Sequence, residues 1–133
     1  MSLLQCIVVS PERTELDVAA ESIILPMFDG EFGILTGHSP VIGRLGYGCL
    51  KLRRAGQAEE RYFLDAGFVQ VANNVVSILT DRLVPISQLS QADAARDLEN
   101  ANRLPSKTTE ARVAKDKAVS RARAQLRLLS SGK

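Results

Sequence analysis

The amino-acid sequence predicts an α+β fold in which an antiparallel β-sandwich over residues 1–87 precedes an antiparallel two-helix hairpin over residues 88–133. In the first part, short runs of β-branched and aromatic residues alternate with Gly, Pro and Asn, which is typical of strands joined by turns. In the second part, Ala, Arg, Gln and Leu dominate, and apolar residues recur every three or four positions, as in amphipathic helices. Many short strands without a helix between them indicate a sandwich or barrel.

Six segments of the first part have the composition of strands. The first ends at Ser10-Pro11 and the second at a proline, and residues 55–58 read as a hairpin turn between the third and the fourth. Asn73 and Asn74 should form a tight turn between the last two, because Asn tolerates left-handed backbone angles. The predicted strands cover residues 4–9, 22–26, 49–53, 60–64, 68–71 and 75–79.

The second part is predicted to form two helices separated by Pro105. Ser90 and Asp93 resemble a capping-box start, and an acid in the first turn is favoured by the helix dipole. This helix should end near residue 103. Ser106 is the expected N-cap of the second helix, which should run over about 107–129 and pack antiparallel against the first.

Alanine dominates the faces on which the two helices should pack. Burying an alanine contributes little beside the roughly 1.5–3 kcal/mol of a buried Leu or Val, which favours a hairpin that can detach and extend. Small side chains also permit close packing, so a static hairpin is the alternative. The predicted inner faces are Ala94, Ala95, Leu98 and Ala101 in the first helix and Ala111, Ala114, Ala118, Ala122, Leu126 and Leu129 in the second.

Charge is distributed unevenly along the chain. Residues 1–87 hold seven Lys/Arg and ten Asp/Glu, net −3, whereas residues 88–133 hold ten and five, net +5. This asymmetry indicates a basic appendage that meets an acidic partner. Nucleic acid is disfavoured as that partner, because the basic side chains have no aromatic platform among them. The sequence has no run of about 18 apolar residues, the length needed to span a membrane. We expect neither a signal peptide nor a transit peptide.

Residues that could carry chemistry are few. His38 is the single histidine, and the sequence has neither a nucleophile–base–acid set nor a Walker-type phosphate loop. We therefore expect a non-enzymatic protein without a cofactor or metal. Cys6 and Cys49 lie in apolar segments without metal-type spacing, which favours two buried reduced thiols over a disulfide.

The most distinctive stretch is residues 29–40. Its three glycines permit backbone angles that a Cβ forbids, and its final proline cannot donate to a sheet ladder. We expect an ordered, tightly turning loop with a short apolar piece at residues 32–35. Asp29, Glu31 and His38 are the polar groups that this loop displays, and such a loop more often positions a surface than forms a core.

Two motifs resemble a known family. DGEFGILTGHSPVIGRLGYG at residues 29–48 is similar to the signature loop of the epsilon subunit of F-type ATP synthase, which is called delta in mitochondria. DAGFVQVANNVVSIL at residues 65–79 is similar to a second segment of that family. Thr36 stands where the family usually has proline, and Ala66 replaces one glycine. The resemblance covers nearly the whole chain.

The resemblance implies a non-catalytic rotor subunit of the central stalk, peripheral to the membrane, on the cytoplasmic side of a bacterial inner membrane or the stromal side of a thylakoid. Its sandwich would couple the gamma subunit to the c-ring during proton-driven ATP synthesis. Glu31 would offer a carboxylate to basic c-ring side chains, with Asp29 in support and His38 at the same interface. Taken alone, these residues read as a solvated turn, and the alternative function is a free-standing β-sandwich adaptor with a basic helical tail.

The second helix carries a set of basic side chains. The resemblance implies that the helices extend along gamma toward an acidic segment of the beta subunits, within the alpha/beta head, and inhibit ATP hydrolysis there. Arginine suits such a latch because it forms bidentate contacts with carboxylates. Taken alone, a basic helix is usually a solvated face. The residues are Lys115, Lys117, Arg121, Arg123 and Arg127.

Some members of the family bind ATP as a regulatory ligand through a motif in the first helix. Asp93 and Arg96 match that motif here, whereas Asp97 places an acid where the motif ends in alanine. An ordinary ion pair between helix positions i and i+3 explains the first two residues equally well. The sequence favours the ion pair over an ATP site.

Overall fold

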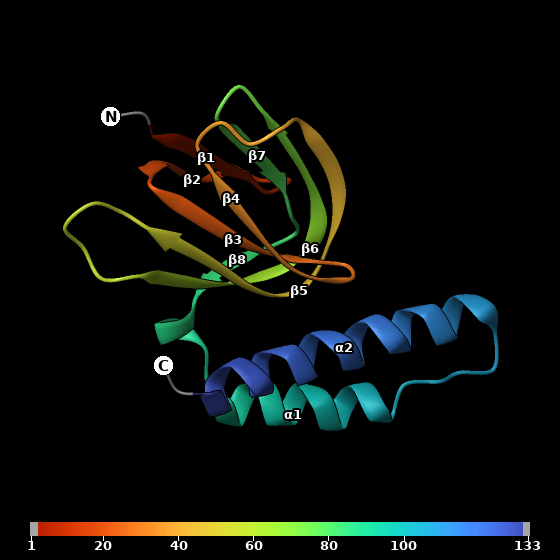
Figure 1. Ribbon diagram of the computed structural model, residues 1–133. Helices are drawn as coiled ribbons and strands as arrows, with labels where there is room; N and C mark the ends of the chain where they lie inside the picture. Colours follow the sequence, from red (N-terminus) through yellow and green to blue (C-terminus); the bar gives the residue numbers. More distant parts are fainter. Residues whose placement is uncertain (1–2, 132–133) are drawn as a thin grey trace. The chain divides into compact units, whose positions relative to one another are not determined.

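The computed structural model describes residues 3–131, which form two compact units (Figure 1). The first unit ends at Pro85 and the second begins at Ile86, two residues before the boundary expected from the sequence. Strands make up the first unit and helices the second. The predicted α+β class is confirmed.

Residues 3–85 form one eight-stranded sheet with the order β2-β1-β7-β6-β5-β3-β4, in which β8 also pairs with β6. Within these residues every pairing is antiparallel except that of β1 with β7, which is parallel. The strands are β1 Leu4–Val9, β2 Thr14–Ala20, β3 Ser22–Met27, β4 Gly30–Leu35, β5 Val41–Arg53, β6 Glu60–Ala72, β7 Val75–Leu79 and β8 Leu83–Pro85.

The sheet folds into a sandwich because β5 and β6 take part in both layers. Residues 41–45 of β5 pair with residues 67–71 of β6, next to β7, whereas residues 47–52 pair with residues 60–65, next to β3 and β8. Where these two stretches of β6 meet, Ala66 and Gly67 have positive φ values of 58° and 128°. Left-handed residues inside a strand bend it sharply, so each long strand turns from one layer into the other at this point.

The bend in β6 depends on glycine. A Cβ at Gly67 would lie 1.8 Å from the carbonyl oxygen of Leu79, where β7 ends, so no other residue fits the space. Ala66 also takes a left-handed conformation, which costs an L-residue roughly 1–2 kcal/mol. The substitution of alanine for the usual glycine there is therefore tolerated at a cost in stability.

Alternating side chains of the strands fill the space between the layers. Leu4, Cys6 and Val8 of β1 are fully buried, and the residues between them are half-buried. These three residues belong to a cluster of buried side chains. Burial of a Leu or Val side chain contributes about 1.5–3 kcal/mol, so the cluster supplies most of the apolar stabilisation of the unit. The cluster also contains Ala20, Ile23, Leu25, Ile34, Leu45, Leu50, Leu52, Leu64, Val69, Val71, Val76 and Ile78.

Four features of the strands differ from the prediction. Residues 30–35 form β4, so the expected loop at 29–40 is in fact two turns with a strand between them. β5 begins at Val41 rather than at residue 49, and β6 is continuous through the predicted break at 65–67. Glycines within these strands hid them, because glycine is rare in regular strand sequences. β2 and β8 were missed because β2 is a charged edge strand and β8 is only three residues long.

The turn between β6 and β7 is confirmed. Asn73 and Asn74 have φ values of 53° and 64°, and Ala72 pairs directly with Val75. Two successive left-handed residues between paired strands are characteristic of a type I′ turn, whose twist matches that of the strands.

The second unit consists, within residues 86–131, of a 3-10 turn, Ile86–Gln88, and two helices, α1 Gln91–Asn102 and α2 Thr109–Ser131, which pack against each other (Figure 1). The hydroxyl of Ser90 accepts a hydrogen bond from the Asp93 amide at 3.2 Å, which confirms the predicted cap. Neither helix in the described part of the chain is long and apolar enough to cross a membrane.

The start of α2 differs from the prediction. Thr108, not Ser106, is the N-cap, because its hydroxyl accepts a hydrogen bond from the Ala111 amide at 3.0 Å. Both side chains can cap a helix, and only the path of the connecting segment decides between them. Residues 103–108 carry the chain past the end of α1, so the first turns of α2 extend beyond its partner (Figure 1).

The inner face of the hairpin differs in part from the prediction. Ala94, Ala101 and Ala122 are buried as predicted, whereas Ala114 and Ala95 are exposed. Residues 98, 111, 118, 126 and 129 are half-buried, and Ala124 and Gln125 join the buried set. The buried alanines of α2 therefore lie in its C-terminal half.

Candidate functional site

Asp29 and Glu31 lie on the hairpin that joins β3 to β4. Met27 pairs with Gly30, so Phe28 and Asp29 form a two-residue turn, and both acids are exposed. The Glu31 carboxylate accepts an ion pair from Lys51 Nζ at 3.4 Å, across β3, and its side chain remains 66% exposed. An exposed pair of this kind is worth about 0–1 kcal/mol, so Glu31 stays available to another cation.

His38 lies in the turn between β4 and β5. Its ring is half-buried and packs edge-on against Phe32, with the centroids 5.2 Å apart, and its Nδ1 lies 2.7 Å from the carbonyl oxygen of Ser39. The strand between this turn and Asp29 has six residues, a length of about 20 Å at the usual rise. The structure therefore places Asp29 and Glu31 toward one end of β4 and His38 beyond the other.

The His38 turn is fastened to a distant part of the chain. The Gly37 amide donates a hydrogen bond of 2.7 Å to Oδ1 of Asn74, in the turn between β6 and β7. The carbonyl oxygen of Asn74 accepts a further bond of 2.8 Å from the Gln5 amide of β1. The two resemblance motifs thus meet at one end of the sandwich, which their separation in sequence did not indicate.

Large apolar side chains are exposed on the outer face of β5, β6 and β7. Ile42, Phe68 and Leu79 are 76%, 56% and 59% exposed. Arg44 pairs with Phe68, and Phe68 pairs with Leu79, and directly paired residues share a face of the sheet. Ile42 lies two residues before Arg44 and therefore points the same way.

Phe28 extends this surface. Its ring lies 4.7 Å below the guanidinium carbon of Arg44, and its amide donates to the Arg44 carbonyl oxygen at 2.9 Å. The ring is 63% exposed, and a cation–π contact of this kind holds both side chains in place. We call Phe28, Ile42, Arg44, Phe68 and Leu79 the outer patch.

The outer patch was missed in the sequence, although a signal was present. Phe68 precedes buried Val69, Leu79 follows buried Ile78, and Ile42 follows half-buried Val41, so apolar residues lie on both faces of strands that should alternate. Contiguous exposed apolar side chains of this size usually mark an interaction surface. The predicted turn residues and this patch are thus separate candidate surfaces on the first unit.

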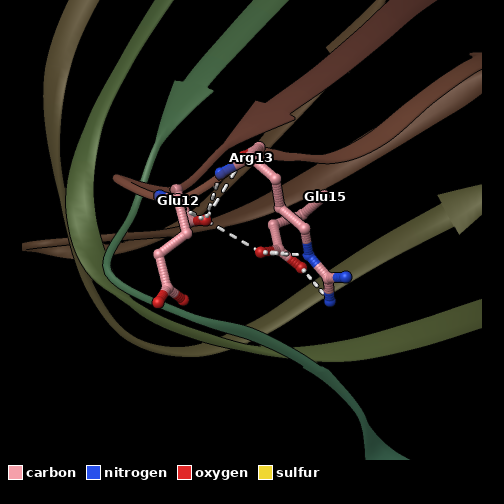
Figure 2. A network of polar contacts seen from close by, with 4 residues as sticks. Glu12, Arg13 and Glu15 are labelled. Atoms are coloured by element: carbon pink, nitrogen blue, oxygen red, sulfur yellow. Dashed lines mark hydrogen bonds and ion pairs between the residues drawn. The ribbon is translucent and has the colours of Figure 1, made fainter.

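A compact polar network orders the turn between β1 and β2 (Figure 2). The buried Ser10 hydroxyl donates to Glu15 at 2.8 Å and accepts from the amides of Glu12 and Arg13. The Arg13 guanidinium pairs with Glu15 at 3.2 Å. The hydrogen bond between Arg13 and Glu15 lowers the pKa of the Glu15 carboxyl and raises the pKa of the Arg13 guanidinium. These contacts satisfy one another, so the network stabilises the turn.

The predicted basic helix divides its side chains between faces. Lys117, Arg123 and Arg127 are exposed, whereas Lys115 and Arg121 are half-buried. Arg112 is a sixth basic residue of this helix and shares a face with Arg123 and Arg127. It lies 11 residues before Arg123, which lies four residues before Arg127, and both spacings are close to whole numbers of helical turns. Asp116 lies on the same face and lowers its net charge.

Asp93 and Arg96 form an ion pair on α1, with both side chains more than 60% exposed. This contact fits the ordinary pairing of residues three apart on a helix. The expectation that this pair is not an ATP site stays a prediction from the sequence.

Both cysteines are buried free thiols. Burial raises the pKa of the Cys6 thiol to about 12 and also raises the pKa of Cys49. A thiol that stays protonated is a poor nucleophile and a poor metal ligand, so both side chains act as core residues.

The sequence is similar to a described family. The profile of the family "ATP synthase, Delta/Epsilon chain, beta-sandwich domain" matches residues 3–86. The ATP synthase epsilon chain of Rhodopirellula baltica is 51% identical over 124 residues, covering 93% of this chain and 96% of that one. The ATP synthase epsilon chain of Bordetella parapertussis is 34% identical over 132 residues, covering 98% and 90%.

Solved structures share the fold. A chain of the Euglena gracilis mitochondrial ATP synthase matches with a TM-score of 0.84 at 23% identity, covering 97% of this chain and 82% of that one. A chain of the central stalk and c-ring of the Tetrahymena thermophila mitochondrial ATP synthase matches with a TM-score of 0.73 at 17% identity, covering 93% and 94%. At these identities the similarity concerns the fold.

Proposed function

The chain belongs to the ATP synthase delta/epsilon family, and we propose on this premise that it is a rotor subunit whose sandwich binds the gamma subunit and rests on the c-ring. It is a non-catalytic subunit of a membrane-associated complex. Its place would be the cytoplasmic side of a bacterial inner membrane or the stromal side of a thylakoid.

The outer patch is the observation that carries this proposal. A rotor subunit must stay attached to the gamma subunit under torque, and such a stable interface needs a desolvated apolar centre. Aromatic residues and arginine dominate the binding energy of protein interfaces, and the patch holds Phe28, Phe68 and Arg44 beside Ile42 and Leu79. We assign the gamma subunit to this patch.

The separation of the turn residues suggests a division of contacts. Asp29 and Glu31 lie at the β3–β4 hairpin, whereas the His38 turn follows β4 and the His38 ring packs against Phe32, so different turns carry the carboxylates and the imidazole. We assign the acidic hairpin, with the accessible carboxylate of Glu31, to basic side chains of the c-ring. The His38 turn would then lie at the interface with gamma.

Co-expression with the gamma subunit tests the proposal. The full chain is expected to elute with gamma as one species in size-exclusion chromatography, and the sandwich alone, residues 1–87, should do the same. Separate elution of the full chain and gamma at micromolar concentration would contradict a role as a rotor subunit.

We further propose that the helical hairpin inhibits ATP hydrolysis by pairing its basic side chains with acidic groups of the beta subunits. Deletion of residues 88–133 is then expected to raise ATP hydrolysis by the assembled enzyme about fivefold or more, because the arginine contacts that oppose rotation are lost. Hydrolysis is measured with the enzyme detached from the membrane, so that no ion gradient contributes.

A charge variant separates this pairing from a general loss of structure. Arg123→Gln with Arg127→Gln removes two exposed charges of α2 and should raise hydrolysis in the same direction as the deletion. Arg96→Gln on α1 is the matched control and should leave the rate unchanged. A deletion enzyme with the hydrolysis rate of the wild type would rule out an inhibitory hairpin.

A further inference from the structure

The turn between β4 and β5 is held in place by a single side chain from another turn. The Gly37 amide donates to Asn74 Oδ1 at 2.7 Å across 37 positions of sequence. The His38 amide donates to the Leu35 carbonyl oxygen at 3.2 Å, but this bond is internal to the turn. The contact with Asn74 therefore ties the His38 turn to the rest of the sheet.

The acceptor is itself fixed. Asn74 takes a left-handed conformation, φ 64°, as part of the turn between β6 and β7, and its carbonyl oxygen accepts a bond from the Gln5 amide at 2.8 Å. The backbone of Asn74 is thus determined by two neighbouring strands. Its side chain carries that rigidity to Gly37, whose own φ of 83° lies in the left-handed region.

The turn needs such a tie because its sequence is permissive. Thr36 stands where the resemblance expects proline, so the backbone before Gly37 lacks the φ restraint of a ring. Glycine adds further freedom. Without the Asn74 bond, the position of His38 would rest on its contacts with Phe32 and Ser39, which lie on the same strand and turn.

The turn also borders the outer patch. Ile42 is 76% exposed and follows His38 by four residues, at the start of β5, where Val41 pairs with Val71 of β6. The His38 turn therefore adjoins the patch through β5, and the β6–β7 turn adjoins it through β6, on which Val71 lies three residues after Phe68. The two turns form one continuous rim at this end of the patch.

We propose that Asn74 is a positioning residue, which locks the β4–β5 and β6–β7 turns together and so presents His38 to the gamma subunit at the rim of the outer patch. This inference rests on the proposed function. Pre-ordering a binding surface reduces the entropy lost on association, so a loosened turn should weaken the complex without unfolding the chain.

The test compares Asn74→Gly with Asn73→Gly. Glycine keeps the left-handed backbone and the bond to Gln5 but removes the acceptor for Gly37, whereas Asn73→Gly makes the same change at the adjacent turn position. In the free chain, amide hydrogen exchange at Gly37 should become roughly fivefold faster in Asn74→Gly alone. The midpoint of thermal unfolding should agree between the two variants to within about 4 °C.

Binding to gamma gives the decisive readout. Asn74→Gly should dissociate from gamma roughly fivefold faster than Asn73→Gly. Because the two variants should unfold at similar temperatures, a difference in stability could not explain this difference in rate. Equal dissociation rates, with wild-type chain still bound to gamma, would overturn the positioning role and leave the proposed function standing. Unchanged exchange at Gly37 would overturn it as well. A wild-type chain that does not bind gamma would overturn both.

Discussion

Gly67→Ala is expected to destabilise the sandwich by about 3 kcal/mol or more, the largest effect of alanine at any glycine in residues 3–131. The new Cβ would lie 1.8 Å from the Leu79 carbonyl oxygen and 3.0 Å from the Thr80 Cα. Both are backbone atoms of the segment that leaves β7, so neither can rotate away. The φ of 128° at this position is in addition strained for any residue with a Cβ. Urea unfolding followed by circular dichroism measures the loss.

Gly33→Ala is the matched control. Gly33 lies on the edge strand β4, a Cβ there would meet no atom within 4 Å, and its φ lies outside the left-handed region. The same chemical change should therefore alter the free energy of unfolding by no more than about 0.5 kcal/mol. Equal midpoints for the two variants would show that β6 and the end of β7 can separate without loss, which would contradict the tight approach of Gly67 to Leu79.

Local patterns were sufficient for the division of the chain and for several of its connections. The change from β-branched residues to alanine near residue 88 marks the change from strands to helices. Asn73-Asn74 and Ser90 were correctly assigned because a tight turn and a helix cap are determined within about four residues. The parallel pairing of β1 with β7 was not foreseen, because it depends on the path of the whole sheet.

The long strands were hidden by the residues that make the sandwich possible. β5 contains glycines at positions 43, 46 and 48, and β6 contains the Ala66-Gly67 bend. Such residues interrupt a strand pattern in the sequence, yet in the structure they let one strand serve both layers. Whether a glycine ends a strand or bends it is decided by the neighbouring strand, which local sequence does not specify.

The candidate site shows the same limit. Asp29, Glu31 and His38 are close in sequence, but β4 separates them along its length. Their actual neighbours, Lys51 for Glu31 and Asn74 for the His38 turn, come from strands that follow much later. The roles of these three residues stay predictions from the resemblance, while the distances between them depend on the topology.

Phe68→Thr combined with Leu79→Thr is expected to raise the dissociation constant for gamma about a hundredfold or more. Buried anchor residues at interfaces each contribute about 2 kcal/mol or more, and these two form a cross-strand pair in the middle of the outer patch. Threonine keeps a high strand propensity, and both positions are exposed in the free chain. Surface plasmon resonance on the full chain measures the affinity, and the unfolding free energy should change by no more than about 1 kcal/mol.

Val113→Thr provides the comparison for this double variant. Val113 is a 47% exposed apolar residue on α2, outside the sandwich, so the same class of substitution there should leave the affinity for gamma unchanged. If the double variant bound gamma as tightly as Val113→Thr, the outer patch would not be the gamma interface, even in a chain that binds gamma. A selective loss would instead explain why strands that need apolar side chains on one face only carry them on both: the inner set holds the sandwich together, and the outer set holds it to its partner.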